Sequence, residues 1–452
     1  MIKRTIQQIA EMLQAECFGD PNTLIEGVCI DSRAVQPNNL YIPIIGQKVD
    51  GHSFLDGVIK KEAGAVLWQK DHKPYPNDLP YILVDDTLPA LQELARVYLR
   101  SLSCQVIAVT GSNGKTSCKD MLYSIFSQEK KTQKTLGNRN SEIGLPLTVL
   151  DLEEDVEVAI LEMGMENKGE IALLTSIAQP DVSIITTIGS AHMENLGGRK
   201  QIAQAKLEIL ENLKEEGLFI YNKESQEIEE CLSEMEIDSS KRLVSFGKEG
   251  DISITSDILY GNEGMEFQCS LFDEPIVLNA LGDFQAMNSL PCIYVALDFG
   301  LAKQSILQGL KELEITKMRT ALVRIGQAKI VDDTYKSNPE SARAALDALM
   351  KVSTKKHIAI LADMLDLGPE EQALHAEIGA YAKAIGVDVL YGTGPLTKFT
   401  VDAAKWMDAK WFETKEEIVD VIRPELEEDC AILIKGSRAM QMDQIVDKLK
   451  EK

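Results

Sequence analysis

Apolar residues follow two alternating patterns along this chain. Short uninterrupted runs, typical of strands buried on both faces, include LYIPI, AVLW, VIAV, VAIL, IAIL and CAILI. Between the runs, apolar residues return at every third or fourth position, as at Ile6, Ile9, Met12 and Leu13, which is typical of helices. This alternation predicts an α/β fold with mostly parallel sheets covered by helices on both faces.

The alternation separates into three stretches. A length of 452 residues suits about three domains at the usual ~150 residues each. A helix predicted at about 89–102 leads directly into the next strand, and a new alternation begins near 317. We therefore expect domains at 1–102, 103–316 and 317–452. Within the second, we expect a strand-rich stretch at about 217–280 and a helix at about 286–300.

The segment from Val106 to Asp120, VIAVTGSNGKTSCKD, combines a strand, a glycine loop and the start of a helix. Loop amides and the helix N-terminus would bind a polyphosphate, Lys115 would reach the terminal phosphates, and Thr116 would bind magnesium. Val109 stands where the general GxxxxGK[ST] pattern has its first glycine, so the loop is a short form. The strand and helix around it favour binding of ATP or GTP. The expected phosphate contacts are Gly111, Ser112, Asn113, Gly114, Lys115, Thr116 and Ser117.

Charge and cysteine content narrow the class of protein. The net charge of −24 argues against the broad basic surface that non-specific nucleic-acid binding requires. The eight cysteines form no CxxC pair, and several lie in apolar runs typical of buried thiols. No run of eighteen apolar residues and no signal-peptide core is present. We expect a cytoplasmic protein that binds neither membrane nor nucleic acid.

Polar residues follow several strand runs at their carboxyl ends, where open α/β sheets bind ligands. Glu162 and His192 end two strands of the second domain, and Asp333, Tyr335 and Lys435 end strands of the third. A carboxylate beside the phosphate loop can hold magnesium, although such a glutamate can also be a solvated loop residue. A lone histidine is often a core or cap residue, and the KGSR turn at 435–438 is equally consistent with a polar loop.

The motifs taken together resemble the Mur ligases, the ATP-dependent amide-forming enzymes of peptidoglycan precursor assembly. The resemblance covers essentially the whole chain and rests on TGSNGKTS, GNRNSEIGLPLT, LEMG, IGSAHMENLG, AKLEIL, MRT, DDTYKSNPES and KGSRAM. The DSR and DGHSF clusters and LPLTVL are most similar to the members that join D-alanyl-D-alanine to a UDP-N-acetylmuramoyl-tripeptide. It implies a UDP-substrate-binding domain, a central P-loop ATP domain and a Rossmann-like acceptor-binding domain.

The resemblance implies a role for particular residues. ATP would phosphorylate the tripeptide carboxylate, and the dipeptide amine would attack the acyl phosphate. Thr116, Glu162 and His192 would hold magnesium, and Lys206, otherwise an ordinary helix lysine, would carry a carbamate that also serves the metal. Lys115, His192 and Lys206 would be catalytic. The further nucleotide contacts implied are Asn288, Arg319 and Asp333. The substrate contacts implied are Ser32, Arg33, Asp50, Gly51, His52, Asn138, Asn140, Tyr335, Asn338, Lys435, Ser437 and Arg438. We expect a monomer.

The chain departs from the family pattern at several positions. Lys336 replaces an amide in the YNANP motif, so that a cation stands near the expected acceptor amine. The other departures are Ser141, Phe284, Gln285 and Ala321. These departures concern the expected adenine contacts and the acceptor rather than the reaction type.

Other functions remain open on the sequence alone. One alternative is a related ligase that adds the third amino acid or glutamates; the absence of a DNPR-like motif from the third domain disfavours the diamino-acid-adding enzyme. Another is a non-catalytic nucleotide-binding paralogue. The sequence does not distinguish lysine from diaminopimelate in the tripeptide.

Overall fold

The computed structural model describes residues 1–190, 193–261, 264–405 and 407–451. The chain divides into two compact units. Unit 1 comprises residues 1–110, 130–183 and 208–218, and unit 2 comprises residues 111–129, 184–207 and 219–452. The positions of the units relative to one another are not determined. The division follows packing and cuts the predicted domain 103–316, so the three domain boundaries stay predictions.

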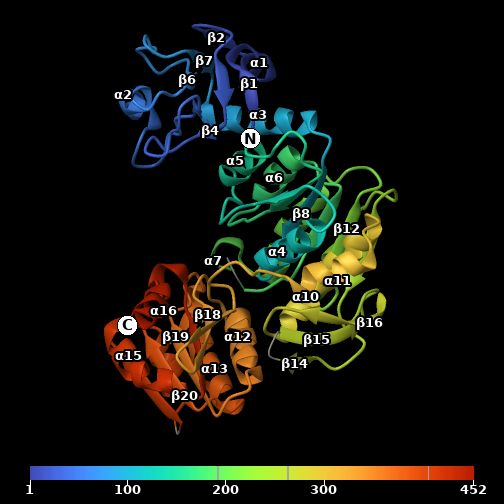
Figure 1. The fold of residues 1–452 in the computed structure, drawn as a ribbon, viewed down its shortest axis with the longest axis vertical. Helices are drawn as coiled ribbons and strands as arrows, with labels where there is room; N and C mark the ends of the chain where they lie inside the picture. Colours follow the sequence, from blue (N-terminus) through green and yellow to red (C-terminus); the bar gives the residue numbers. More distant parts are fainter. Residues whose placement is uncertain (191–192, 262–263, 406, 452) are drawn as a thin grey trace. The chain divides into compact units, whose positions relative to one another are not determined.

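The amino-terminal part of unit 1 is built on a five-stranded sheet (Figure 1). Its strand order is β2 (Glu16–Phe18), β7 (Tyr81–Val84), β6 (Ala65–Gln69), β5 (Leu40–Tyr41) and β4 (Val28–Cys29). Only the β2–β7 pair is antiparallel. The strands β1 (Lys3–Thr5) and β3 (Leu24–Glu26) form a separate antiparallel pair. The helices are α1 (Ile6–Met12), α2 (Leu55–Ile59) and α3 (Thr87–Ser101).

Helix α3 joins this part to the rest of unit 1. It begins after Asp86, whose carboxylate accepts a hydrogen bond from the Leu88 N–H and caps the helix. The residues Leu91, Leu94 and Tyr98 recur at helical spacing and are fully buried. The helix packs against α5 (Gly144–Leu150) and α6 (Glu170–Ala178). The predicted helix at about 89–102 is therefore confirmed.

The central sheet has six strands in the order β13 (Arg242–Phe246), β12 (Leu218–Asn222), β11 (Val182–Ile185), β8 (Gln105–Thr110), β10 (Val158–Glu162) and β9 (Thr132–Lys134). Strand β10 is parallel to both β8 and β9. An antiparallel three-stranded sheet follows, formed by β14 (Leu259–Gly261), β15 (Gly264–Cys269) and β16 (Phe272–Leu278). The remaining helices are α4 (Lys115–Phe126), α7 (Met193–Leu196), α8 (Arg199–Leu207), α9 (Gln226–Glu234), α10 (Asp283–Asp298) and α11 (Lys303–Lys311).

Two predicted elements of the second domain end earlier than their apolar patterns suggest. The strand expected to run toward His192 ends at Ile185, because the hydroxyls of Thr186 and Thr187 bind a loop backbone. The spacing of Ile202, Ala205, Ile209 and Leu213 predicts a helix that carries Lys206 and extends to about Leu213. In the structure this helix ends at Leu207 and continues as a 3-10 turn at Glu208–Leu210. The Glu208 carboxylate accepts hydrogen bonds from the Gly169 and Ala172 N–H groups at the start of α6, which explains an acidic residue within an apolar run.

The carboxyl-terminal part of unit 2 is a second six-stranded sheet covered on both faces (Figure 1). Its order is β17 (Ala321–Ile325), β18 (Ala328–Asp333), β22 (Cys430–Lys435), β19 (Lys356–Ala362), β20 (Val389–Thr393) and β21 (Asp408–Phe412). Only β17 is antiparallel to its neighbour. One face packs on α12 (Pro339–Lys351), α13 (Glu371–Ala384) and α14 (Thr397–Ala403), and the other on α15 (Lys415–Ile422) and α16 (Asp443–Lys450). The predicted alternation is confirmed, whereas β17 and β21 were not predicted.

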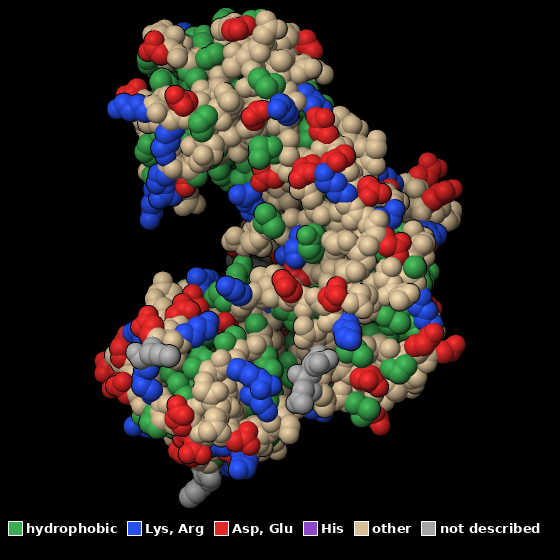
Figure 2. All heavy atoms as spheres, in the orientation of Figure 1, with side chains coloured by type: hydrophobic (Ala, Val, Ile, Leu, Met, Phe, Trp, Pro, Cys, Tyr) green, Lys and Arg blue, Asp and Glu red, His purple; other side chains and the backbone are tan. Residues whose placement is uncertain are grey.

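Acidic and basic side chains are interspersed on the face of the molecule shown in Figure 2. Among the described residues, no helix has both the length and the apolar character needed to cross a bilayer.

Candidate active site

The phosphate loop lies between β8 and α4, as the sequence predicts. Its glycines are required by close packing. Gly114 has a φ of +83°, and a Cβ there would lie 2.7 Å from Asn288 Oδ1. A Cβ on Gly111 would lie 2.0 Å from Thr186 Oγ1. A side chain at either position would therefore push the loop away from α10 or from the segment after β11. The predicted nucleotide contact Asn288 is thus brought against the loop.

Hydrogen bonds fix the loop conformation. The Ser112 N–H donates to the Thr187 carbonyl at 2.8 Å, and the Gly189 N–H donates to Ser112 Oγ at 2.9 Å. The Lys115 ammonium donates to the Gly111 carbonyl at 2.6 Å, so its charge lies over the loop. A fixed loop with a cation above it and the α4 N-terminus beneath suits polyphosphate binding.

Lys206 is a buried amine whose pKa is lowered by its surroundings. It lies on α8 and is 2% exposed. Burial, followed by the positive charges of Lys115 and Lys336, holds the pKa of Lys206 well below its usual value of 10.5. The lowered pKa favours the neutral form of the Lys206 amine, which is the form that can act as a nucleophile.

Glu162 and Asn140 are brought together in unit 1. Glu162 is 2% exposed at the carboxyl end of β10, where Asn140 Nδ2 donates to its Oε1 at 2.8 Å. The carbonyl of Asn138 accepts from the Asn140 N–H, also at 2.8 Å. A buried carboxylate and the Thr116 hydroxyl are oxygen ligands of the kind magnesium prefers. Thr116 belongs to unit 2 and Glu162 to unit 1, and His192 lies outside the described residues.

A buried ion pair organises the ends of β18 and β22. Asp333 and Lys435 are register partners, and Lys435 Nζ donates to Asp333 Oδ2 at 2.6 Å and to the Lys336 carbonyl at 2.8 Å. The other Asp333 oxygen accepts from the Thr320 N–H at 3.1 Å. These bonds hold the turn that follows β18. They also show that Lys435 positions this turn from within the sheet.

The turn after β18 presents several of the predicted contacts. The Arg319 guanidinium lies 3.8 Å from the centroid of the Tyr335 ring. Asn338 caps α12 by accepting from the Ser341 N–H, and its Nδ2 donates to Asn113 Oδ1 at 3.0 Å. A residue predicted to meet the acceptor is thus in contact with the phosphate loop.

The side chains of the KGSR turn at 435–438 contact different parts of the protein. Ser437 Oγ accepts from the Leu365 N–H, whereas Arg438 pairs with Asp443 at 2.8 Å on the surface. Arg438 and the buried Lys435 therefore point to different surroundings.

In the amino-terminal part, Asp50 and His52 form a cluster with His72, which the sequence reasoning missed. Asp50 lies 2.7 Å from His52 Nδ1 and 3.7 Å from His72 Nδ1. The two imidazoles stack with an interplanar angle of 16°. One ligand atom from each of Asp50, His52 and His72 lies within 4.8 Å of the other two, so the three residues could together hold a metal ion. His52 is 3% exposed, and burial is the largest cause that lowers its pKa.

The remaining predicted substrate residues lie nearby in the same part. A Cβ on Gly51 would lie 2.8 Å from the Ile44 nitrogen, so the turn packs tightly. Arg33, which follows Ser32, is 89% exposed and pairs with Asp31, whose pKa it lowers to about 2. An exposed guanidinium is available to an anionic substrate.

Comparisons with known proteins extend over the whole chain. Residues 24–99 match the family model "Mur ligase family, catalytic domain", residues 109–296 match "Mur ligase middle domain", and residues 318–438 match "Mur ligase, glutamate ligase domain". The UDP-N-acetylmuramoyl-tripeptide–D-alanyl-D-alanine ligase of Bacillus subtilis is 37% identical, with 100% of this chain and 99% of that protein aligned. The protein of the same name from Escherichia coli is 30% identical, with 100% and 99% aligned.

Solved structures agree with the sequence matches. A crystal structure of MurF from Acinetobacter baumannii has a TM-score of 0.90 at 27% identity and covers 100% of both chains. The MurF ligase of Thermotoga maritima in complex with ADP has a TM-score of 0.83 at 27% identity, covering 94% of this chain and 97% of that one. The motifs, the fold and these full-length matches show that the chain belongs to the Mur ligase family.

Proposed function

We propose that this protein joins D-alanyl-D-alanine to a UDP-N-acetylmuramoyl-tripeptide by ATP-dependent amide bond formation in peptidoglycan precursor synthesis. The observation that carries the proposal is full-length similarity to ligases of that name, combined with a phosphate loop whose geometry suits ATP. We further propose a monomer that acts in the cytoplasm, with functional domains at 1–102, 103–316 and 317–452.

The proposed reaction has two steps. An oxygen of the tripeptide carboxylate attacks the terminal phosphorus of ATP, the bond to ADP breaks, and an acyl phosphate forms. The uncharged amine of the dipeptide then attacks the acyl carbon, phosphate leaves, and the amine loses a proton. Negative charge accumulates on the transferred phosphoryl group in the first step, so cationic and amide donors accelerate it. Lys115 and the loop amides of 111–117 are suited to that task.

Magnesium would be held by Thr116, Glu162 and His192, where it would neutralise phosphate charge. Lys206 would carry a carbamate. Its burial and the neighbouring lysine charges support this, because only a neutral amine adds to carbon dioxide and the resulting anion would relieve the repulsion among the lysines.

For the nucleotide, we propose Asn288, Arg319 and Asp333 as further contacts. For the UDP end of the substrate, we propose Ser32, Arg33 and the turn at 50–52. For the muramoyl peptide we propose Asn138 and Asn140. For the acceptor we propose Tyr335, Asn338, Ser437 and Arg438. Lys435 would contribute by holding the turn that follows β18.

Phosphate release tests the reaction. Tripeptides with lysine or diaminopimelate are crossed with D-alanyl-D-alanine and with free diamino acids. Release that requires both a tripeptide and D-alanyl-D-alanine supports the proposal, whereas dependence on a free diamino acid alone overturns it. If the wild type releases no phosphate with any pair, the non-catalytic alternative holds. Lys115→Ala should abolish release while retaining the folded state by circular dichroism.

The carbamate has a readout that does not depend on activity. Protein equilibrated with 13C-bicarbonate should give a carbamate carbon resonance that Lys206→Gln lacks. Removal of dissolved carbon dioxide should lower activity, and added bicarbonate should restore it. A spectrum identical for the two proteins would contradict the modification.

A further inference from the structure

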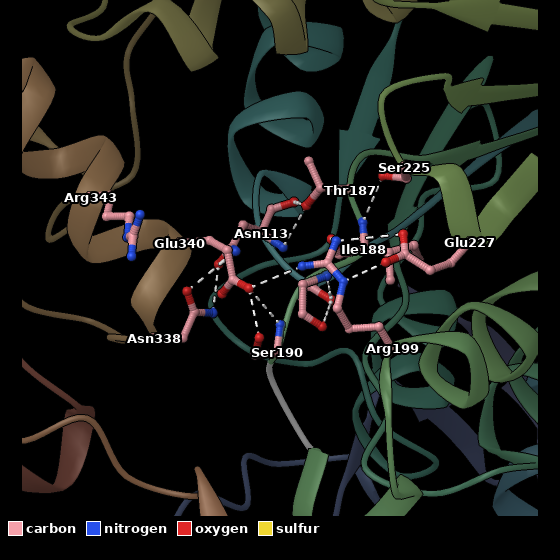
Figure 3. Close-up of polar contacts among 12 residues, drawn as sticks. Asn113, Thr187, Ile188, Ser190, Arg199, Ser225, Glu227, Asn338, Glu340 and Arg343 are labelled. Carbon is pink, nitrogen blue, oxygen red and sulfur yellow. Dashed lines mark hydrogen bonds and ion pairs between the residues drawn. The ribbon is translucent and has the colours of Figure 1, made fainter. Parts of the chain in front are cut away.

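Glu340 bonds two segments that lead to predicted active-site residues (Figure 3). It lies in the first turn of α12, where the helix N-terminus favours a carboxylate. Its Oε1 accepts from the Ser190 N–H at 3.1 Å and from the Ser190 hydroxyl at 2.7 Å, and it lies 3.4 Å from Arg199 Nη1. No sequence motif assigns Glu340 a role of its own.

The two contacts reach different elements of the same site. Ser190 belongs to the segment that follows β11 and precedes His192, and Gly189 in that segment donates to Ser112 of the phosphate loop. Arg199 begins α8, and Lys206 lies seven residues later, about two turns along the same face. The carboxylate of Glu340 therefore touches both segments that carry predicted metal-site groups.

Arg199 is itself held from the opposite side. Its Nε donates to Glu227 Oε1 at 2.5 Å, and its Nη2 donates to the Ile188 carbonyl at 3.1 Å. Figure 3 shows the guanidinium between Glu227 and Glu340. The arginine thus has a fixed anchor on α9, and Glu340 is the group that adds the link to α12.

A second contact acts in parallel. Asn338, two residues before Glu340, bonds Asn113 of the phosphate loop. One helix start therefore meets the phosphate loop, the segment after β11 and the start of α8. Glu340 Oε2 is buried and bonds no donor among the described residues, so the carboxylate has room for one more hydrogen bond.

We propose that Glu340 is a positioning residue for the ligase reaction: through Ser190 and Arg199 it couples the placement of α12 and its acceptor-side turn to the phosphate and metal site. This inference rests on the proposed function. Glu340 links the acceptor-side turn to the segments that carry the metal-site groups, alongside the contact of Asn338 with the phosphate loop. Loss of its charge uncouples them without removing a group that touches ATP.

The chain offers a matched control. Glu377 on α13 pairs with Arg343 of α12 at 2.9 Å, and both side chains are about half exposed. Figure 3 shows Arg343 on the same helix as Glu340 but outside the network. Glu377→Gln therefore removes an equal charge from an ion pair with helix α12, outside the network that Glu340 forms.

The test compares Glu340→Gln with Glu377→Gln in the full chain. Loss of a charge-assisted bond of this kind corresponds to roughly a tenfold effect. We expect Glu340→Gln to lower kcat about tenfold and to raise the magnesium concentration that gives half the maximal rate. The KM for the UDP-tripeptide should stay within about twofold of the wild-type value, because the contacts proposed for the UDP end of this substrate lie in unit 1. Glu377→Gln should match the wild type, and both variants should unfold at the wild-type temperature.

A double-mutant cycle with Ser190→Ala identifies the route. If both residues act through one bond, the double variant is no slower than the slower single variant, whereas independent roles multiply the two losses. Should Glu340→Gln fail to fold, Ser190→Ala alone carries the same kcat prediction. Multiplied losses, or equal kinetics for Glu340→Gln and Glu377→Gln, overturn the inference.

A binding measurement separates this inference from the proposed function. Calorimetric titration with ADP and magnesium requires no turnover. We expect Glu340→Gln, but not Glu377→Gln, to weaken magnesium-dependent ADP binding severalfold. If the wild type forms no product but Glu340→Gln still binds ADP more weakly, the proposed function fails and the coupling stands. If the wild type turns over normally and both variants bind ADP as the wild type does, only the coupling fails.

Discussion

Removal of the Lys435 charge should strongly destabilise the carboxyl-terminal sheet. Lys435 is 1% exposed and its partner Asp333 is 11% exposed, with 2.6 Å between nitrogen and oxygen. At that separation and an effective dielectric constant of ~20, the Coulomb attraction is about 6 kcal/mol. Desolvation of the two ions offsets most of it, so the pair itself adds little. Lys435→Met leaves Asp333 buried without its counter-ion, which should lower the free energy of unfolding by about 3–5 kcal/mol.

The double variant Asp333→Asn/Lys435→Met distinguishes an unpaired charge from lost packing. Asparagine can still accept from the Thr320 N–H, and methionine fills the space of the lysine stem. We expect the double variant to recover most of the loss. Hydrogen-exchange mass spectrometry of peptides from β18 and β22 measures the opening free energy directly. A loss below about 1 kcal/mol for Lys435→Met, or a double variant worse than the single one, would refute the reasoning.

Three further predictions concern Gly114, His375 and the Cys118–Cys292 pair. Gly114→Ala should weaken ADP binding, measured by calorimetry, at least tenfold. A Cβ would lie 2.7 Å from Asn288 Oδ1, and the φ of +83° costs about 1–3 kcal/mol for alanine. An unchanged affinity for ADP would contradict this prediction. Burial lowers the pKa of His375 below 6.5, so its stabilising contribution is complete above about pH 6.5 and is lost as pH falls toward the folded-state pKa. His375→Gln should flatten the acid side of a stability–pH profile, and an unchanged slope would count against this. Cys118 and Cys292, whose sulfurs lie 3.4 Å apart in the core, should react with a thiol reagent only after unfolding, and labelling of either residue in the native protein, located by peptide mapping, would disprove it.

The sequence predicted the phosphate loop because all of its determinants are local. A strand, two glycines and a helix start lie within fifteen residues of one another, and the close approaches at Gly111 and Gly114 explain why no other residue type stands there. Lys206 is the opposite case. Its spacing resembles that of any helix lysine, and only its burial beside Lys115 and Lys336, which no local pattern encodes, makes it chemically unusual.

The two strands that were missed share a physical cause. Strand β17 alternates between half-buried and exposed positions, and β21 does so over most of its length, at opposite edges of the carboxyl-terminal sheet. Uninterrupted apolar runs identify strands buried on both faces, so they find the central strands and pass over the edges. The sheet register is equally hidden, because the pairing of Asp333 with Lys435 joins residues about a hundred positions apart.

The Asn338 side chain both caps α12 and bonds the phosphate loop. Its Oδ1 caps α12 and its Nδ2 bonds Asn113, so both polar ends of the amide are engaged within the protein. Glu340 in the same helical turn bonds Ser190. A capped helix start is rigid, since its free N–H groups are satisfied. The phosphate loop and the segment after β11 are therefore held by one rigid body, and a displacement of α12 must move or break both contacts together.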